Sequence, residues 1–109
     1  MTKLTTIAVD QLQSMQGTKL GISPWVQLSQ LMVNQFAEIT NDHQFIHTDP
    51  ERAGAETPFG GTIAHGFLTL SQLTQMAEST LPVIKDVRMS INYGFDRIRF
   101  ITPVRSDAR

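Results

Sequence analysis

The sequence contains no cysteine, only one tryptophan and one tyrosine, and no excess of either charge. Without cysteine the chain can form neither disulfides nor thiolate zinc sites, and it has no cysteine nucleophile. Nine Lys and Arg residues stand against ten Asp and Glu residues, giving a net charge of −1, and they form no basic stripe. The sequence therefore offers no positively charged patch to bind nucleic acid or an anionic membrane surface, and we expect neither as a partner.

Long hydrophobic runs are also missing. No stretch approaches the roughly 20 apolar residues of a membrane-spanning helix, and the first ten residues lack the continuous apolar region of a signal peptide. We therefore expect a cytoplasmic location. What is present is a globular composition, 40% hydrophobic and 17% charged over 109 residues, which predicts one domain spanning residues 1–109.

Hydrophobic periodicity predicts three helices. Apolar residues recur at three- and four-residue steps over residues 9–16 and over residues 30–40, where Ser29 is placed to cap the helix. Residues 67–77 are apolar around most of the helical wheel, which predicts a buried central helix surrounded by other structure. Residues 49–61, rich in Pro, Gly and charge, predict a turn, a short helical turn near residues 51–53, and a loop.

Two further stretches, one between the first two predicted helices and one after the third, favour strands. Residues 20–28 favour extended chain because Pro24 disfavours a helical Ser23 and the residues after it favour strands. From Val87 to Ile101 apolar residues alternate with polar ones, which predicts one long strand or two.

The most polar stretch, Thr40 to Pro50, follows the second predicted helix. It places Asp42 five residues before His47, an acceptor anion near an imidazole that can take and give a proton at neutral pH. This pairing indicates an acid–base site. An ordinary turn is the alternative, because Asp and Asn gather after helices for local backbone bonding.

A glycine-rich stretch, residues 58–67, leads into the predicted central helix. Gly61 and Gly66 have the glycine spacing of a phosphate-binding loop, but Phe67 and Leu68 stand where Lys and Ser or Thr are required, so that motif fails. Gly66 can still offer a free backbone N–H to an anion at the start of a helix. Close packing explains the same glycine equally well.

Together the two stretches resemble the MaoC-like dehydratases and (R)-specific enoyl-CoA hydratases of the hot-dog superfamily. Asp42, His47 and the Asp49-Pro50 pair stand as in the family's first motif, and residues 60–66, Gly-Gly-Thr-Ile-Ala-His-Gly, match its second. Residues 92–100 are similar to the strand that follows the family's central helix. One departure is Gln44-Phe45, where the family often has Asn-Pro.

The resemblance implies an α+β hot-dog fold, an antiparallel sheet wrapped around a long central helix. It implies that Asp42 and His47 hold the water that adds across a trans-2-enoyl thioester, and that the Gly66 amide stabilises the developing enolate. It also implies an acyl-CoA substrate, contacted by a set of residues from both motifs and the central helix: Gln44, Phe45, Ile63, His65 and Thr74. For His65, capping or packing at the helix start is the alternative role.

No metal or cofactor is expected. His43 and His47 have the four-residue spacing of a helical zinc pair, but no Glu follows His43, and Pro50 leaves little room for the helix. The resemblance implies a hydro-lyase that needs no cofactor.

Two rival functions stay open. A hot-dog thioesterase would need a carboxylate beside the central helix, where Glu78 is the only acid and lies far from Gly66. A non-catalytic acyl-binding or dimerising module is the second rival.

Because the family's sheet has further strands, we expect this chain to lack the C-terminal ones. We further expect a homodimer or higher homo-oligomer, with a separate segment or a partner chain completing the sheet.

Overall fold

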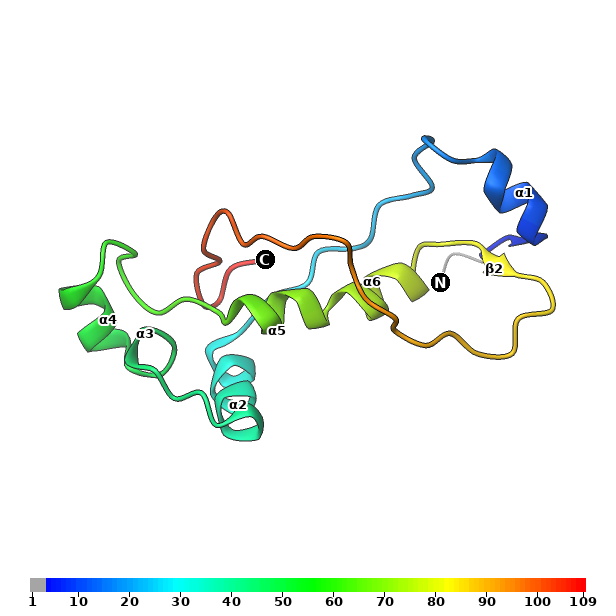
Figure 1. The fold of residues 1–109 in the computed structure, drawn as a ribbon. Coiled ribbons are helices and arrows are strands. Elements are labelled where there is room, and N and C mark those ends of the chain that lie inside the picture. Colours follow the sequence, from blue (N-terminus) through cyan, green and yellow to red (C-terminus); the bar gives the residue numbers. More distant parts are fainter. Residues whose placement is uncertain (1–3) are drawn as a thin grey trace. The chain divides into compact units, whose positions relative to one another are not determined.

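A computed structural model describes residues 4–109 (Figure 1). The chain divides into two compact units, one formed by residues up to 24 and 74–98, the other by residues 25–73 and 99–109. Helices and one short sheet make up the regular structure of the described residues, in the order β1 (Thr6–Ile7), α1 (Val9–Ser14), α2 (Gln30–Thr40), α3 (Phe45–Thr48), α4 (Pro50–Glu56), α5 (Gly66–Ser71), α6 (Leu73–Glu78) and β2 (Val83–Ile84). No helix in the described part of the chain combines the length and apolarity needed to cross a membrane.

The first unit contains the sheet. Strand β1 (Thr6–Ile7) pairs in parallel with β2 (Val83–Ile84), Thr6 lying opposite Val83. Helix α1 (Val9–Ser14) follows β1, close to the predicted range 9–16, and the Gln11 side chain accepts a hydrogen bond from the Ala8 amide at its start. Helix α6 (Leu73–Glu78) lies in this unit from residue 74 onward.

The second unit contains α2 (Gln30–Thr40), α3 (Phe45–Thr48), α4 (Pro50–Glu56) and α5 (Gly66–Ser71). Its core is a cluster of four buried residues, Leu28, Val33, Ala64 and Leu68. Val26, Met32, Phe36 and Val104 pack against this cluster.

The predicted helix over residues 30–40 is confirmed as α2. The Ser29 side chain accepts a hydrogen bond from the Met32 amide at 3.2 Å, as expected of an N-cap. The apolar stripe of α2 buries Val33 and Ala37 completely and leaves its opposite face in solvent. At its other end Asn41 adopts a left-handed conformation, with φ of 58°, that stops the helix just before Asp42.

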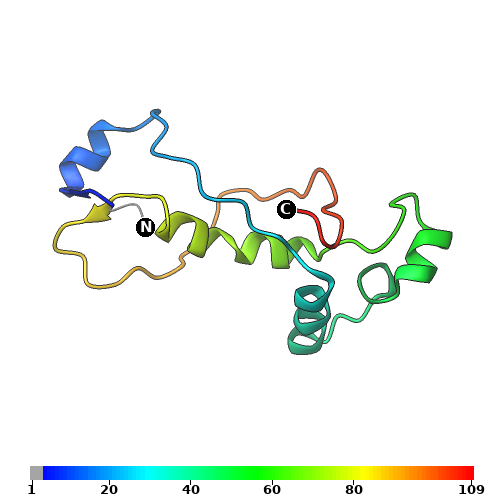
Figure 2. The ribbon, with the colours of Figure 1, turned by 180° about the vertical axis from the view of Figure 1, so that it is seen from behind.

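The C-terminal segment runs beside the glycine-rich stretch that leads into α5 (Figure 2). The Ala64 amide donates to the Val104 carbonyl at 2.7 Å, and the Ser106 amide donates to the Thr62 carbonyl at 3.0 Å. Leu28, at the end of the predicted extended stretch, exchanges two backbone hydrogen bonds with residues 107 and 108. These pairings fix the backbone around residues 62–66, where the second motif lies.

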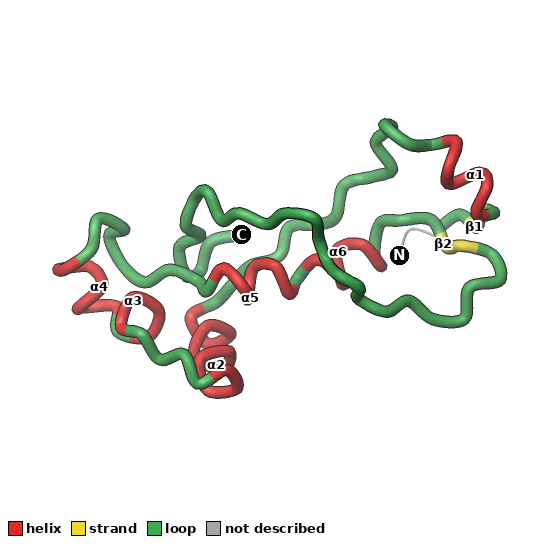
Figure 3. Tube along the Cα trace, in the orientation of Figure 1, coloured by secondary structure: helices red, strands yellow, loops and turns green. Residues whose placement is uncertain are grey.

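Two predictions about regular structure are wrong. The stretch 87–101 forms no strand and is drawn as loop in Figure 3, because its backbone groups make no hydrogen bond to another described residue from 88 to 101. The predicted central helix is broken at Gln72 into α5 and α6. That helix is not buried all round either: Leu68 is buried, whereas Phe67 is 70% exposed.

Candidate active site

Asp42 lies at the exit of α2, where its backbone is held in place. Its amide donates to the Ala37 carbonyl at 3.1 Å, closing the end of the helix. Its carboxylate oxygen Oδ1 lies 3.4 Å from the Gln44 amide, an arrangement that turns the chain toward α3. The side chain remains 51% exposed, so the carboxylate is accessible to water.

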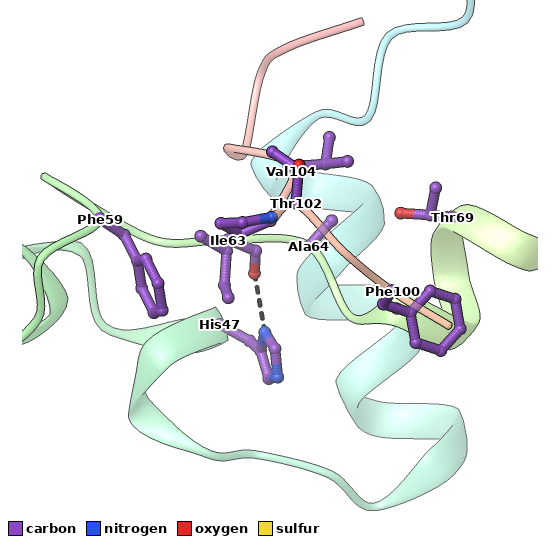
Figure 4. Close-up of a pocket in the computed structure, with 10 residues that line it drawn as sticks. His47, Phe59, Ile63, Ala64, Thr69, Phe100, Thr102 and Val104 are labelled. Carbon is purple, nitrogen blue, oxygen red and sulfur yellow. Dashed lines mark hydrogen bonds between the residues drawn. The ribbon is translucent and has the colours of Figure 1, made fainter. Parts of the chain in front are cut away.

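His47 lies in α3, a four-residue helix with no periodic pattern that would predict it, and its side chain is buried. The Ile63 carbonyl lies 2.7 Å from Nδ1 of His47 (Figure 4). A carbonyl oxygen can only accept, so Nδ1 must carry the proton. In the neutral ring Nε2 is therefore left with a lone pair, which is the form that a general base requires.

Burial lowers the pKa of His47 from the ordinary value of 6.5. The hydrogen bond to the Ile63 carbonyl opposes this shift, nearby His65 adds to it, and the Asp42 carboxylate opposes it. At neutral pH the ring is therefore uncharged, with Nε2 ready to accept a proton.

His65 lies directly before α5 and contacts both predicted acid–base residues. Its ring stacks on the ring of His47, with the centroids 3.8 Å apart and the planes at 22°. Its Nε2 atom lies 3.0 Å from the Asp42 carbonyl oxygen, and Phe36 contacts the ring edge-on. His65 is the N-cap residue of α5, but its side chain makes no capping bond to the described residues and packs against the rings of His47 and Phe36 instead.

Side-chain atoms of Asp42, His47 and His65 all lie within 4.8 Å of one another. A spacing of this size admits one water molecule bonded to two of them. The nearly parallel imidazole rings do not converge on one point as the ligands of a tetrahedral zinc would, so we assign no metal to the cluster. His43, the other half of the zinc spacing, lies 3.4 Å from Glu38 instead.

A pocket of about 250 Å³ opens beside this cluster. Ten residues line it: His47, Phe59, Ile63, Ala64, Gly66, Thr69, Phe100, Thr102, Pro103 and Val104. Most of the lining side chains are apolar, and none is acidic. The pocket thus offers His47 an adjoining space for an apolar group.

Gly66 contributes backbone to this pocket. Its amide, at the first position of α5, has no hydrogen-bond partner among the described residues. The Phe100 ring lies directly against its Cα, so that a Cβ at this position would lie 2.7 Å from a ring carbon. Gly66 therefore packs closely against Phe100 and also has an N–H without a partner among the described residues. The two explanations for this glycine are compatible.

The structure brings some of the predicted site residues together and leaves others apart. Ile63 lines the pocket and orients His47. Gln44 and Phe45 lie outside the pocket lining, where Phe45 stacks under the Arg52 guanidinium 4.0 Å from the ring centroid. Thr74 lies in α6, in the first unit, and its role stays a prediction.

Several pocket residues were not predicted from the sequence. Thr69 lies three residues after Gly66 in α5, and helical spacing alone would have found it. Phe100 and Val104 come from the C-terminal segment, more than 30 residues from Gly66, and no local signal marks them.

Comparisons with known proteins place the chain among its relatives. The chain is 54% identical to nodulation protein N of Rhizobium meliloti over 103 residues, which are 94% of this chain and 64% of that protein. It is 47% identical to 3-hydroxyacyl-thioester dehydratase Z of Mycobacterium tuberculosis over 102 residues, which are 94% of this chain and 66% of that protein. The chain thus spans slightly less than two thirds of the length of these curated relatives.

The fold has a counterpart among solved structures. A crystal structure of a protein from Archaeoglobus fulgidus superposes with a TM-score of 0.55 at 21% identity, covering 90% of this chain and 67% of the other. The expected hot-dog fold is confirmed by this likeness together with the family match, although the described residues form only a two-stranded sheet. Residues 11–109 match the family described as the MaoC like domain, and the chain therefore belongs to the MaoC-like family.

Proposed function

We propose that this site adds water across the double bond of a trans-2-enoyl-CoA, or removes it from the corresponding 3-hydroxyacyl-CoA. The observation that carries the proposal is the neutral His47 ring, held by the Ile63 carbonyl with its Nε2 lone pair free, beside the exposed carboxylate of Asp42. The similarity to a protein named as a 3-hydroxyacyl-thioester dehydratase supports the same class of reaction.

In the hydration direction, one water is held between Asp42 and His47. Nε2 of His47 removes a proton from this water as its oxygen bonds to the β-carbon of the enoyl group, and the α-carbon then receives a proton from the acid–base pair. Dehydration reverses these steps, with the β-hydroxyl leaving as water. General acid–base assistance of this kind contributes about 10²–10⁴-fold in rate.

Negative charge develops on the thioester oxygen as the enolate forms, and Gly66 is our candidate donor to it. The amide has no partner among the described residues, and it borders the same pocket as His47. A donor already oriented toward this oxygen stabilises the transition state more than the ground state. The apolar lining around Phe59 and Phe100 suits the hydrocarbon part of an acyl group.

We also propose that the protein acts as a cytoplasmic homodimer or higher homo-oligomer. Support comes from the apolar side chains of residues 87–101, which are exposed at Met89, Ile91, Tyr93 and Phe95. Exposed apolar groups on an unpaired, extended backbone favour pairing with another chain or segment.

The test is an assay of the purified protein with crotonyl-CoA, following loss of the enoyl thioester and formation of 3-hydroxybutyryl-CoA. Asp42→Ala and His47→Ala should each lower the rate about 10²-fold or more. His43→Ala is the matched control, because His43 lies on the surface beside Glu38 and outside the pocket lining.

The same assay separates the rival functions. Release of free CoA without a hydrated product would indicate a thioesterase, for which no acidic side chain lines the described pocket. Saturable binding of the thioester with no turnover would indicate a non-catalytic acyl-binding module. A hydration rate unaffected by Asp42→Ala and His47→Ala would overturn the assignment of these two residues.

A further inference from the structure

His65 is the one described side chain whose contacts reach both Asp42 and His47. The ring is 3% exposed and lies between α2, α3 and the start of α5. On one side it hydrogen-bonds the Asp42 backbone, and on its face it stacks against the His47 imidazole. It does not line the pocket, and its predicted contact with the substrate stays a prediction.

We propose that His65 is a positioning residue that fixes the separation between the Asp42 carboxylate and the His47 imidazole. The inference rests on the proposed function, because it assigns His65 the task of aligning that acid–base pair. His65 does this in two ways: its Nε2–H donates a hydrogen bond to the Asp42 carbonyl, and its ring provides a flat surface against which the His47 ring packs.

The hydrogen bonds determine which ring nitrogen of His65 carries the proton. The Asp42 carbonyl can only accept, so Nε2 is the donor. Nδ1 is buried and has no hydrogen-bond partner among the described residues. A proton there would leave a buried donor unsatisfied, so the hydrogen bonds favour the tautomer with the proton on Nε2.

This arrangement leaves little freedom to the backbone at Asp42. The Asp42 amide is bonded to the Ala37 carbonyl at the end of α2, and the Asp42 carbonyl is bonded to His65. His47 is held in the same way, by the Ile63 carbonyl at Nδ1 and by the His65 ring on its face. Loss of His65 would free the Asp42 carbonyl and one face of His47, and a displacement near 1 Å can cost about 10²-fold in rate.

Two substitutions separate the contacts of His65. His65→Phe keeps a ring to stack on His47 and removes the donor, whereas His65→Gln keeps a donor at a similar reach and removes the ring. We expect His65→Phe to lower kcat about 10- to 100-fold, with KM changed by no more than about threefold. His65→Gln should retain a higher kcat than His65→Phe. Wild-type kcat in His65→Phe, or equal kcat in the two variants, would overturn the positioning role of the donor.

Val33→Ala is the control for a general loss of packing. Val33 is fully buried in the core cluster of the same unit, does not itself line the pocket and makes no hydrogen bond or ring contact with His65, although Ala64 of that cluster borders the pocket. It should lower the unfolding temperature and leave kcat close to wild type in the folded protein. A kcat loss in Val33→Ala as large as in His65→Phe would indicate that His65 acts only through stability.

A double-mutant cycle distinguishes this inference from the proposed function. If Asp42→Ala lowers kcat, adding His65→Phe to that variant should lower it little further, because the group that His65 aligns is already gone. Additive losses would overturn the positioning role while leaving the acid–base assignment intact. If Asp42→Ala and His47→Ala have no effect, the proposed function itself has failed.

A readout without substrate tests the same bond directly. In ¹⁵N-histidine NMR spectra of the wild-type protein above pH 7, His65 should show a protonated Nε2 and an unprotonated Nδ1. The opposite tautomer would overturn the assignment of Nε2 as donor to Asp42, whatever the kinetic results.

Discussion

The Ile63 carbonyl accepts a 2.7 Å hydrogen bond from Nδ1 of His47, and this bond joins the two motifs of the chain. Ile63 belongs to the glycine-rich motif, whereas His47 belongs to the polar motif 16 residues earlier. In the same region the Ile63 amide donates to the Ile46 carbonyl at 2.9 Å. The second motif thus orients the imidazole of the first, in addition to supplying Gly66.

The lowered pKa of His47 predicts how hydration depends on pH. Burial is the main cause, and it favours the neutral ring. If neutral His47 is the base, kcat/KM should be constant near pH 7 and fall as the pH drops through a midpoint below 6.5. The measurement is kcat/KM for crotonyl-CoA against pH; a midpoint above 6.5 would contradict it.

The same shift predicts a dependence of stability on pH. Between the lowered pKa of folded His47 and the 6.5 of the unfolded chain, the unfolded state binds more protons, so stability rises with pH in that window. The stability that neutral His47 contributes is fully present above about pH 6.5, and it is lost as the pH falls through the pKa of His47 in the folded state. Comparing urea unfolding of wild type and His47→Gln from pH 5 to 7.5 checks this, because the variant should show a shallower dependence.

Two substitutions at Gly66 separate the effect on activity of an added methyl group from the effect of a lost N–H donor. Gly66→Ala keeps the N–H but places a Cβ 2.7 Å from the Phe100 ring, so we expect a loss of activity through that clash. Gly66→Ala combined with Phe100→Ala should recover part of it. Gly66→Pro removes the donor, and Phe100→Ala should not rescue it. Equal rescue in both pairs of folded variants would point to packing as the only role of Gly66.

Asp49 provides a test of how the scaffold supports His47. Its side chain accepts from the Arg52 amide at 3.1 Å and so caps α4, the helix that packs against α3. Asp49→Ala should lower the free energy of unfolding by about 0.5–2 kcal/mol, whereas Asp49→Asn should cost less because Asn caps equally well. Urea unfolding measures both. An equal loss in the two variants would mean that the charge matters and the cap does not.

The sequence predicted α2 with its observed bounds because both causes are local. An apolar stripe at three- and four-residue steps fixes the helix, and Ser29 satisfies its first amides. The four residues of α3 could not be found in this way, since one helical turn has no period to detect. Its hydrogen bonds run to the nearby Gln44 and Phe45 carbonyls and follow no pattern in the sequence.

The sequence pairs Asp42 with His47 but does not predict the contacts around them. Asp42 and His47 are five residues apart, and their proximity followed from the motif. The contact of His65 with Asp42 spans 23 residues, so no spacing in the sequence indicates it. The strand expected at residues 87–101 failed for a related reason, because alternation marks a segment able to pair and says nothing about the partner.

That segment gives the last prediction. Its odd-numbered residues from 87 to 95 are apolar and exposed, Tyr93 completely, and the backbone from 88 to 101 makes no hydrogen bond to the described residues. An extended backbone with free donors and acceptors on an apolar segment is a template for another strand. We therefore expect light scattering to show an assembly larger than one chain, with amides in this segment protected from hydrogen exchange.

Single charges on the two faces of the segment test this pairing. Ile91→Lys places a charge on the apolar face and should reduce the assembly to single chains, because burying an unpaired ammonium is costly. Asn92→Lys places the same charge on the opposite face and should leave the assembly intact. Both positions are exposed in the isolated chain, so without a partner the two substitutions should behave alike. Equal behaviour, or a wild-type protein that is a monomer with fast exchange in this segment, would contradict the prediction.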